Sequence, residues 1–307
     1  MSDIGIIIVT YNSAAEIGAC LDAALASGAE TIVVDNASED GTIEEVGRRG
    51  VRLIANPENR GFAGAVNQGF AEIKNPYVLL LNPDAVILTS LEPLRQACDL
   101  PNSAGAGGQL VGADGRPQIG FMVRGLPTPA ALVLEALLLN RCWPGNPVNR
   151  RYRCMDWDSS ARSTVEQPAG AFFMVRRAVW QELGGLDEGF FPLWFEDVDF
   201  CGRIRDRGFS LYYVPEAVAK HTGGHSVPQL PLEMRLIYWY RSLLRYSAKH
   251  FHPFAFRAVC VAVVMGSFLR GIAESAVHRS FKPMAAYGRV ASLAGRSLFC
   301  GRLGYIS

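Results

Sequence analysis

Four apolar runs in the first 81 residues constrain the fold more than any other feature of the chain. They are short, rich in Val, Ile and Leu, and apolar throughout instead of alternating between apolar and polar residues. Runs of this kind, alternating with helical segments, are typical of parallel strands that helices cover on both faces. We therefore predict an α/β domain with a mostly parallel central sheet. The predicted strands lie at 4–10, 31–35, 51–55 and 77–81, and helices are predicted at 14–27 and 60–73.

Polar residues follow three of these strands directly, at 10–13, 35–42 and 82–84. The carboxyl ends of parallel strands meet at one edge of a sheet, and open α/β sheets bind ligands beyond that edge. Asp35 opens the second cluster, where its carboxylate could accept hydrogen bonds from a base or a ribose. An ordinary turn between a strand and a helix explains the same residues equally well.

Two further positions have the chemistry of metal ligands. Asp84 follows a buried strand, where its carboxylate could share a divalent cation with a diphosphate. The alternative is that Asp84 caps a helix. His221 precedes a pair of glycines and could complete a metal site or contact a phosphate, although loop histidines are commonly just solvated.

The sequence Glu196-Asp197-Val198-Asp199 is the sharpest acidic feature, because it directly follows the largely apolar segment 190–195. Apolar surroundings raise the pKa of a carboxyl group toward the range of a useful general base. The alternative is an acidic first turn of a helix, which the helix dipole favours. The two interpretations are compatible.

Between about 101 and 165 the pattern loosens, and Pro, Gly and Asn are interspersed with a short apolar helix at 130–139. We expect a lid or an acceptor-binding surface in this region. Further along the chain, strands are predicted at 171–175 and 210–214, and helices at 177–183 and 200–207.

The near-neutral total charge of +1 conceals two opposite halves. Residues 1–229 carry 19 Lys and Arg against 27 Asp and Glu, whereas residues 230–307 carry 11 against 2. The total does not indicate a nucleic-acid-binding protein. We predict a catalytic domain over 1–229 and a helical C-terminal region over 230–307 that contacts an anionic membrane surface. A helical cap or a homo-oligomer interface is the alternative.

Membrane contact in the tail is predicted to be peripheral, since the apolar segment 258–269 between Arg257 and Arg270 is shorter than the ~20 residues of a spanning helix. Aromatic and basic residues interleave over 238–257, as in helices that lie on a membrane surface. Seven scattered cysteines without a C-x-x-C pair and an N-terminus without signal-peptide features predict a reducing, cytoplasmic compartment.

In their order along the chain, these motifs resemble glycosyltransferase family 2, the inverting nucleotide-sugar enzymes of the GT-A fold, and within it a rhamnosyltransferase-like branch. The resemblance covers roughly residues 4–226, and the combination is far more specific than any single motif. The motifs are Val9-Thr-Tyr-Asn12, Val33-Val-Asp-Asn-Ala-Ser-Glu-Asp-Gly-Thr42, Asn59-Arg-Gly-Phe-Ala-Gly-Ala-Val-Asn-Gln-Gly69, Leu79-Leu-Leu-Asn-Pro-Asp84, Gly170-Ala-Phe-Phe-Met-Val-Arg-Arg177, Gly185-Leu-Asp-Glu-Gly-Phe-Phe191, Phe195-Glu-Asp-Val-Asp-Phe200 and His221-Thr-Gly-Gly-His-Ser226.

The resemblance implies a role for each matching position. Asp197 would be the general base, and Glu196 would orient an acceptor or sugar hydroxyl. Asp84 and His221 would bind Mg²⁺ or Mn²⁺, with Asn82 at the first position of the family's D-x-D motif. The implied nucleotide-sugar-binding residues are Thr10, Tyr11, Asn12, Asp35, Asn36, Arg60, Gly61, Phe62, Gly64, Asn67, Asn82 and Asp84.

The implied reaction transfers a sugar from a nucleotide-diphosphate sugar donor to a glycan or lipid-linked acceptor in cell-envelope polysaccharide synthesis. L-rhamnose from dTDP-rhamnose is the favoured donor sugar. UDP-linked hexoses, UDP-galactofuranose and UDP-N-acetylglucosamine are alternatives. A nucleotidyltransferase would need a basic, glycine-rich phosphate loop, and residues 9–13 contain no basic residue. A non-catalytic nucleotide-sugar-binding protein is the remaining alternative.

Overall fold

The computed structural model describes residues 2–223 and 230–300. The chain divides into two compact units, and each is described separately. The first comprises residues 1–126, 153–192 and 196–226, and the second comprises residues 127–152, 193–195 and 227–307. Residue 229, on one side of the predicted boundary at 229/230, and the motif residues 224–226 lie outside the described residues.

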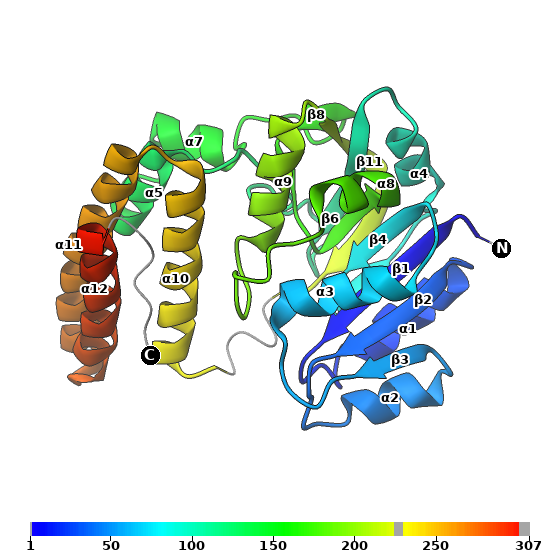
Figure 1. Ribbon diagram of the computed structural model, residues 1–307, viewed down its shortest axis with the longest axis horizontal. Helices are drawn as coiled ribbons and strands as arrows, with labels where there is room; N and C mark the ends of the chain where they lie inside the picture. Colours follow the sequence, from blue (N-terminus) through cyan, green and yellow to red (C-terminus); the bar gives the residue numbers. More distant parts are fainter. Residues whose placement is uncertain (1, 224–229, 301–307) are drawn as a thin grey trace. The chain divides into compact units, whose positions relative to one another are not determined.

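The first unit contains an α/β sheet and the helices that cover it (Figure 1). Its elements are β1 (Ile4–Thr10), α1 (Ile17–Ala26), β2 (Glu30–Asp35), α2 (Thr42–Arg48), β3 (Arg52–Ala55), α3 (Gly61–Glu72), β4 (Tyr77–Leu81), β5 (Ala85–Ile87), α4 (Glu92–Cys98), β6 (Ser103–Val111), β7 (Val123–Arg124), β8 (Ser163–Val165), β9 (Gln167–Pro168), β10 (Phe172–Arg176), α8 (Arg177–Leu183), α9 (Glu196–Asp206) and β11 (Ser210–His221).

Nine strands of the described residues form the main sheet, in the order β3-β2-β1-β4-β10-β6-β11-β5, with β8 paired to β11. The four strands predicted from the apolar runs pair in parallel, as expected. β10 then runs antiparallel to both β4 and β6, and β6 pairs in parallel with β11. β1 is buried at every residue, which agrees with a central strand covered on both faces.

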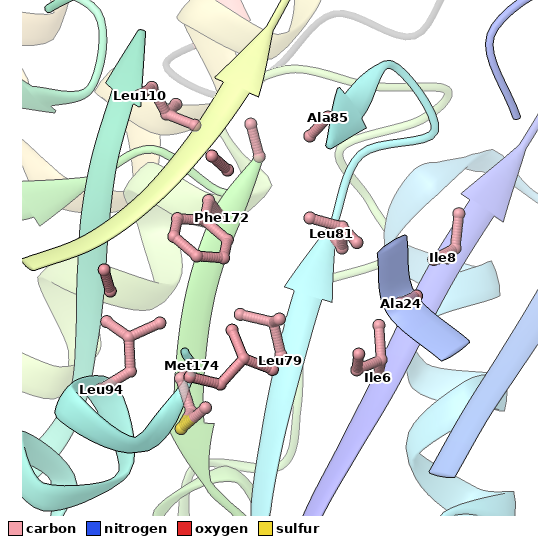
Figure 2. Packing of buried hydrophobic residues seen from close by; sticks show 14 of the residues in the cluster. Ile6, Ile8, Ala24, Leu79, Leu81, Ala85, Leu94, Leu110, Phe172 and Met174 are labelled. Atoms are coloured by element: carbon pink, nitrogen blue, oxygen red, sulfur yellow. The ribbon is translucent and has the colours of Figure 1, made fainter. Parts of the chain in front are cut away.

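Apolar side chains of α1, α4 and the sheet form one continuous core (Figure 2). Ile6 and Ile8 of β1 point to the same face as Leu79 and Leu81 of β4, because side chains two residues apart share a face of a strand. The opposite face receives α3, where Gly69 lies against Ile7. A core of this kind holds the ends of the strands in place at the polar edge of the sheet.

The prediction of a loose segment over 101–165 was wrong for β6, which lies inside the sheet. Its glycines are the reason that the sequence resembles a loop. A side chain at Gly105 would collide with the backbone oxygen of Met174, and one at Gly108 would collide with the ring of Phe172. These glycines therefore permit close packing between strands instead of marking a turn.

Two element boundaries differ from the predictions in ways that matter for the site. α9 begins at Glu196, four residues before the predicted start at 200, so that Glu196 and Asp197 lie in its first turn. β11 continues past the predicted end at 214 to His221, with shifts of register along its pairing with β6. The histidine is therefore held at the end of a strand instead of in a loop.

The second unit is helical, and α11 packs against α5, α10 and α12 within it (Figure 1). The apolar segment predicted to end at Arg257 and Arg270 continues through both residues. Among the described residues, α11 is the one helix long and apolar enough to cross a membrane by length and composition. The elements of this unit are α5 (Pro129–Ala136), α6 (Leu139–Cys142), α7 (Pro147–Tyr152), α10 (Leu232–His250), α11 (Pro253–His278) and α12 (Lys282–Cys300).

Candidate active site

Asp35 ends β2 beside Thr10 at the end of β1, and both residues are fully buried. Asp35 Oδ1 accepts hydrogen bonds from Thr10 Oγ1 at 2.7 Å and from Ser38 Oγ at 2.6 Å. Its Oδ2 accepts the backbone N–H of Ser38 at 2.9 Å. All of these contacts are internal, so Asp35 orders the wall of the predicted nucleotide pocket. Direct contact between Asp35 and a base stays a prediction.

The turn after β1 is tied to the turn after β2. The backbone N–H of Asn12 donates to Ser38 Oγ at 2.8 Å, and Asn12 Oδ1 accepts the N–H of Glu39 at 2.8 Å. Asn12 has a φ of 49°, in the left-handed region that Asn adopts more readily than most residues. Tyr11, next to it, is half-buried. The structure therefore brings the predicted residues of these two turns together.

Asn36 connects this turn to the start of α3. Its Nδ2 donates to the backbone oxygen of Gly61 at 3.1 Å, and its Oδ1 accepts the N–H of Arg60 at 3.3 Å. Gly61 has a φ of 74°, and a Cβ there would lie 2.9 Å from Phe191 and 3.0 Å from the oxygen of Pro192. Glycine is therefore required at this position. The side chain of Arg60 is exposed and free to approach a phosphate.

The body of α3 contacts the loop that follows α8. The backbone N–H of Phe62 donates to Pro192 O at 2.7 Å. The Asn67 side chain donates to Leu186 O at 3.0 Å and accepts the Leu186 N–H at 2.9 Å. Gly64 is buried. Asn67, predicted to contact the nucleotide-sugar, thus uses its amide to hold the 185–188 loop in place.

Asp84 and His221 meet because β5 pairs antiparallel with β11, which places His221 opposite Ala85. Asp84 Oδ1 lies 3.5 Å from His221 Nε2, and both side chains are largely buried. Asn82, at the start of the same turn, is half-buried, and its backbone N–H donates to Ala171 O at 3.0 Å. The structure therefore brings the two predicted metal ligands together.

Gln118 holds the imidazole ring of His221 in place. Gln118 Nε2 donates to the backbone oxygen of His221 at 2.8 Å, so Gln118 Oε1 is the atom that lies 3.1 Å from His221 Nδ1. His221 Nδ1 then donates to Gln118 Oε1, and Nε2 is the ring nitrogen that faces the Asp84 carboxylate. In a neutral imidazole this nitrogen carries the lone pair, and together with a carboxylate oxygen it suits a bound cation.

No cluster of three or more His, Cys, Asp or Glu side chains suited to a metal occurs within 2–223 and 230–300. The pair would therefore supply two ligands and leave the remaining positions for diphosphate oxygens and water. This is the usual way in which proteins hold a cation that acts on a phosphate substrate.

The acidic residues at the start of α9 have different environments. Asp199 is fully buried and forms an ion pair with Arg203 at 2.9 Å, and Arg203 also donates to the backbone oxygens of Leu183 and Gly185. Asp199 therefore anchors the helix. Asp197 is half-buried, and its carboxylate accepts the N–H of Val198 at 2.8 Å and that of Gly170 at 3.3 Å.

Burial raises the pKa of the Asp197 carboxyl group, while hydrogen bonds from backbone N–H groups and the charge of Arg124 act in the opposite direction. Burial and the charge of Asp197 raise the pKa of Glu196 well above its ordinary range. Glu196 is 7% exposed, and its Oε2 has no hydrogen-bond partner among the described residues. Of the two groups, Asp197 is the one that ionises first as the pH rises.

The residues immediately before α9 have an unusual backbone. Trp194 and Phe195 adopt φ values of 76° and 69°. Positive φ is rare and strained for bulky residues, and such strain is concentrated at functional sites. These two residues directly precede Glu196, the first residue of α9.

The two residues before β10 link the predicted metal ligands to the predicted base. Ala171 O accepts the N–H of Asn82, two residues before Asp84, and the N–H of the adjacent Gly170 donates to Asp197. Both acidic groups therefore lie at the same edge of the sheet, although 113 positions separate them in sequence. Their joint placement was predicted only through the family resemblance.

Three residues of this edge, all in the segment after β6, were not predicted from the sequence. Gln118 orients His221, and the ring of Phe121 stacks on the His221 ring with 5.0 Å between centroids. Arg124 lies over Phe121 and acts electrostatically on Asp197. A cationic side chain near Asp197 suits a diphosphate. Nothing in the local sequence pattern around these residues indicates such roles.

The chain is similar in sequence and in fold to known glycosyltransferases. Residues 5–154 match the family model described as "Glycosyl transferase family 2". The chain is 29% identical over 243 residues to the N-acetylglucosaminyl-diphospho-decaprenol L-rhamnosyltransferase of Mycobacterium tuberculosis, covering 74% of this chain and 78% of that protein. The chain is a glycosyltransferase that is similar to family 2 over residues 5–154.

The glycosyltransferase also resembles the low-salt glycan biosynthesis hexosyltransferase Agl10 of Haloferax volcanii, at 26% identity over 69% of this chain and 64% of that protein. Among solved structures, the mannosyltransferase PcManGT from Pyrobaculum calidifontis, in complex with GDP-Man and Mn²⁺, superposes with a TM-score of 0.52. Sequence identity to PcManGT is 20%, with 95% of this chain and 80% of that chain covered. The fold is that of GT-A glycosyltransferases, as predicted.

Proposed function

We propose that this glycosyltransferase transfers L-rhamnose from dTDP-rhamnose to a hydroxyl group of a glycan or lipid-linked acceptor in cell-envelope polysaccharide synthesis. The observation that carries the proposal is the placement of Asp197, Asp84 and His221 at one edge of the sheet, beside the turns after β1 and β2. The donor sugar is taken from the mycobacterial relative, whose name specifies an L-rhamnosyltransferase.

Asp197 has the environment of a general base in a single displacement. Its carboxylate is half-buried, so a hydroxyl group can reach it, and burial raises its pKa, which strengthens it as a base. As Asp197 takes the proton, the acceptor oxygen forms a bond to the anomeric carbon. The bond from that carbon to the diphosphate oxygen breaks, and its electron pair leaves with the diphosphate. Attack from the opposite side inverts the configuration.

Asp84 and His221 would hold a divalent cation, and Gln118 would keep His221 Nε2 available for it. Bound there, the cation would offset the charge of the leaving diphosphate. A carboxylate together with an imidazole suits Mn²⁺ better than Mg²⁺, which prefers oxygen ligands. Arg124 and the exposed Arg60 would contribute further positive charge near the phosphates.

A thermal-shift panel of purified protein tests the donor assignment. The panel contains dTDP-rhamnose, UDP-galactose, UDP-galactofuranose, UDP-N-acetylglucosamine, GDP-mannose and ATP, each with and without Mn²⁺. A ligand that binds the native state raises its stability by mass action, so we expect the largest metal-dependent shift with dTDP-rhamnose. A larger shift with another nucleotide-sugar would replace the proposed donor, and the name of the hexosyltransferase relative makes hexose donors the main competitors. Binding without turnover on any acceptor would favour a non-catalytic protein.

The helical C-terminal region, predicted over 230–307, is proposed to bring the catalytic domain to the cytoplasmic face of a membrane. This region has 11 basic and 2 acidic residues, and this composition supports contact with anionic lipids. A lipid-linked acceptor would give such contact a purpose. Assembly into a homo-oligomer through the same helices is the competing explanation.

A further inference from the structure

The exposed face of α11 is apolar. The exposed face of a helix at a protein surface is ordinarily polar. Five large side chains on this face of α11 are between 43% and 59% exposed. Their spacing of four, three, one and three residues places them in one stripe along the helix. Single exposed apolar residues are common, but a continuous row of this size indicates a binding surface. This row, the α11 stripe, consists of Val261, Met265, Phe268, Leu269 and Ile272.

The opposite face of α11 is already occupied within its own unit. A Cβ at Gly266 would lie 1.9 Å from the backbone oxygen of Ala136 in α5, so the two helices are in close contact there. A Cβ at Gly271 would lie 3.0 Å from the sulfur of Met284 in α12. Arg270 donates to Glu135 O at 2.7 Å. These contacts determine the rotation of the helix about its axis. The stripe therefore points away from the helices that α11 packs against.

Charges at the ends of the stripe are all positive. Arg257 is exposed before the stripe, and Arg279 and Lys282 are exposed after it. The two acidic residues of 230–307 are engaged elsewhere, since Glu233 pairs with Arg289 and Glu274 accepts a hydrogen bond from Tyr287 at 2.9 Å. An apolar row between basic ends complements a bilayer whose headgroups are anionic.

Exposed aromatic side chains extend the stripe at both ends, with Phe254 at 73% and Phe281 at 86% exposure. From Arg257 to Arg279 the helix is about 33 Å long at ~1.5 Å per residue. Because its other face is packed on α5 and α12, α11 cannot be surrounded by lipid. A position parallel to the membrane plane satisfies both faces of the helix.

A second copy of the chain fits the stripe less well. In an antiparallel pairing of two α11 helices, Arg257 of one copy would approach Arg279 and Lys282 of the other. In a parallel pairing, Arg257 would approach its own counterpart. Either arrangement brings like charges together without an exposed acidic partner, which disfavours association.

We propose that the α11 stripe is the surface by which this glycosyltransferase binds an anionic bilayer, with α11 lying in the plane of the headgroup–acyl boundary. The proposal names the residues for the membrane contact inferred above and rests on it. It makes the contact specific to the outer face of one helix. Lipid binding through this face does not depend on which donor sugar the enzyme uses.

Co-sedimentation of the full-length protein with vesicles of phosphatidylcholine and phosphatidylglycerol tests the proposal. We expect the double substitution Phe268→Glu/Leu269→Glu to lower partitioning at least about tenfold, because it places two carboxylates where apolar side chains would enter the bilayer. Leu88→Glu is the matched control, since Leu88 is as exposed as Phe268, at 55%, but belongs to the first unit. We expect this control to partition like the unsubstituted protein.

Unchanged partitioning of the double variant would overturn the proposal. A second result would also overturn it. In this result the unsubstituted protein does not bind vesicles and forms a dimer in analytical ultracentrifugation, whereas the double variant is a monomer. Circular dichroism and the melting temperature check that each variant is folded. The donor panel is run on the same proteins, so failure of the donor assignment and failure of the membrane surface give different results.

Discussion

Glu196 and Asp197 are neighbours in sequence, yet their surroundings assign them different protonation states over the same pH range. Asp197 is half-buried and receives two backbone hydrogen bonds, which stabilise its charged form. Glu196 is buried, with one oxygen unpartnered among the described residues, and the charge of Asp197 further disfavours its ionisation. A proton acceptor beside a carboxyl group that keeps its proton suits deprotonation of an acceptor hydroxyl.

Asp197→Asn is expected to lower kcat by about 10²–10⁴-fold, because general-base catalysis contributes about that much. Donor binding, measured by thermal shift, should be retained, since the amide keeps the size of the side chain. Asp206→Asn, at the exposed end of the same helix, is the control and should leave kcat unchanged. Near-normal turnover of Asp197→Asn would exclude this residue as the base.

Glu196 predicts a pH dependence of stability. Its pKa is raised in the folded state, so the folded protein holds this proton more tightly than the unfolded chain does. The contribution to stability is therefore full below the unfolded pKa and is lost as the pH rises toward the folded pKa. Glu196→Gln should flatten this decline as the pH rises above 4.5, the ordinary pKa of a glutamate, in urea-unfolding measurements. The exposed Glu44→Gln should not, and an equal effect of both would rule out the prediction.

Gln118→Ala is expected to weaken Mn²⁺ binding by about 10–100-fold, the usual effect of losing the partner that orients a ligating histidine. The measurement is a Mn²⁺ titration of the thermal shift at a constant nucleotide concentration. Gln96→Ala, on the exposed face of α4, should bind Mn²⁺ normally. If both variants keep normal Mn²⁺ affinity, His221 does not depend on Gln118 for its orientation.

At the scale of elements, α3 is positioned by its first residue. Gly61 combines a positive φ with close contacts to Phe191 and Pro192, and the next N–H donates to Pro192. The same turn is held by Asn36. The start of α3 thereby joins the turn after β2 to the loop before α9, so a distortion at Gly61 affects both sides of the proposed donor pocket.

Gly61→Ala should therefore lower the free energy of unfolding by about 1–3 kcal/mol, the typical cost of a strained backbone conformation. Gly47→Ala is the matched control. Gly47 lies within α2, where a Cβ would meet nothing within 4 Å, so alanine should stabilise the helix by roughly 0.5–1 kcal/mol. Urea unfolding of both variants measures the contrast, and equal effects would contradict this account of the turn.

Elements also show where prediction from sequence succeeds and fails. The runs that became β1, β2 and β4 were predicted because these strands are buried along nearly their whole length, which leaves an unbroken apolar pattern. β3 was predicted from a shorter apolar run, although it is an edge strand with no fully buried residue. β6 was missed because its glycines are required by close contacts with residues of other strands, and such contacts cannot be read from the local sequence. The start of α9 was placed too late, since the positive φ values of Trp194 and Phe195 leave no local signal.

At the scale of the whole molecule, the separation of charge along the chain predicts a salt-dependent membrane affinity. Residues 1–229 are net acidic and residues 230–307 net basic. Binding to anionic vesicles should decrease between about 0.05 M and about 0.5 M NaCl, as screening shortens the reach of the basic residues. A residual affinity should persist, because burial of the α11 stripe does not depend on charge. Complete loss of binding at high salt would show that the α11 stripe does not contribute to membrane binding. Neutral vesicles provide the control.

The sequence by itself determined the class of fold and the positions of the parallel strands along the chain. Through its motifs it also determined the family and the identity of the proposed site residues. These properties follow from local patterns, because burial on both faces and turn chemistry act on consecutive residues. Only the tertiary structure decided that Asn36 and Asn67 hold loops, that Asp199 anchors a helix, and that Gln118 orients His221. Each of these depends on a contact between residues brought together by strand pairing or by packing of a helix turn, and such contacts leave no pattern in the chain around them.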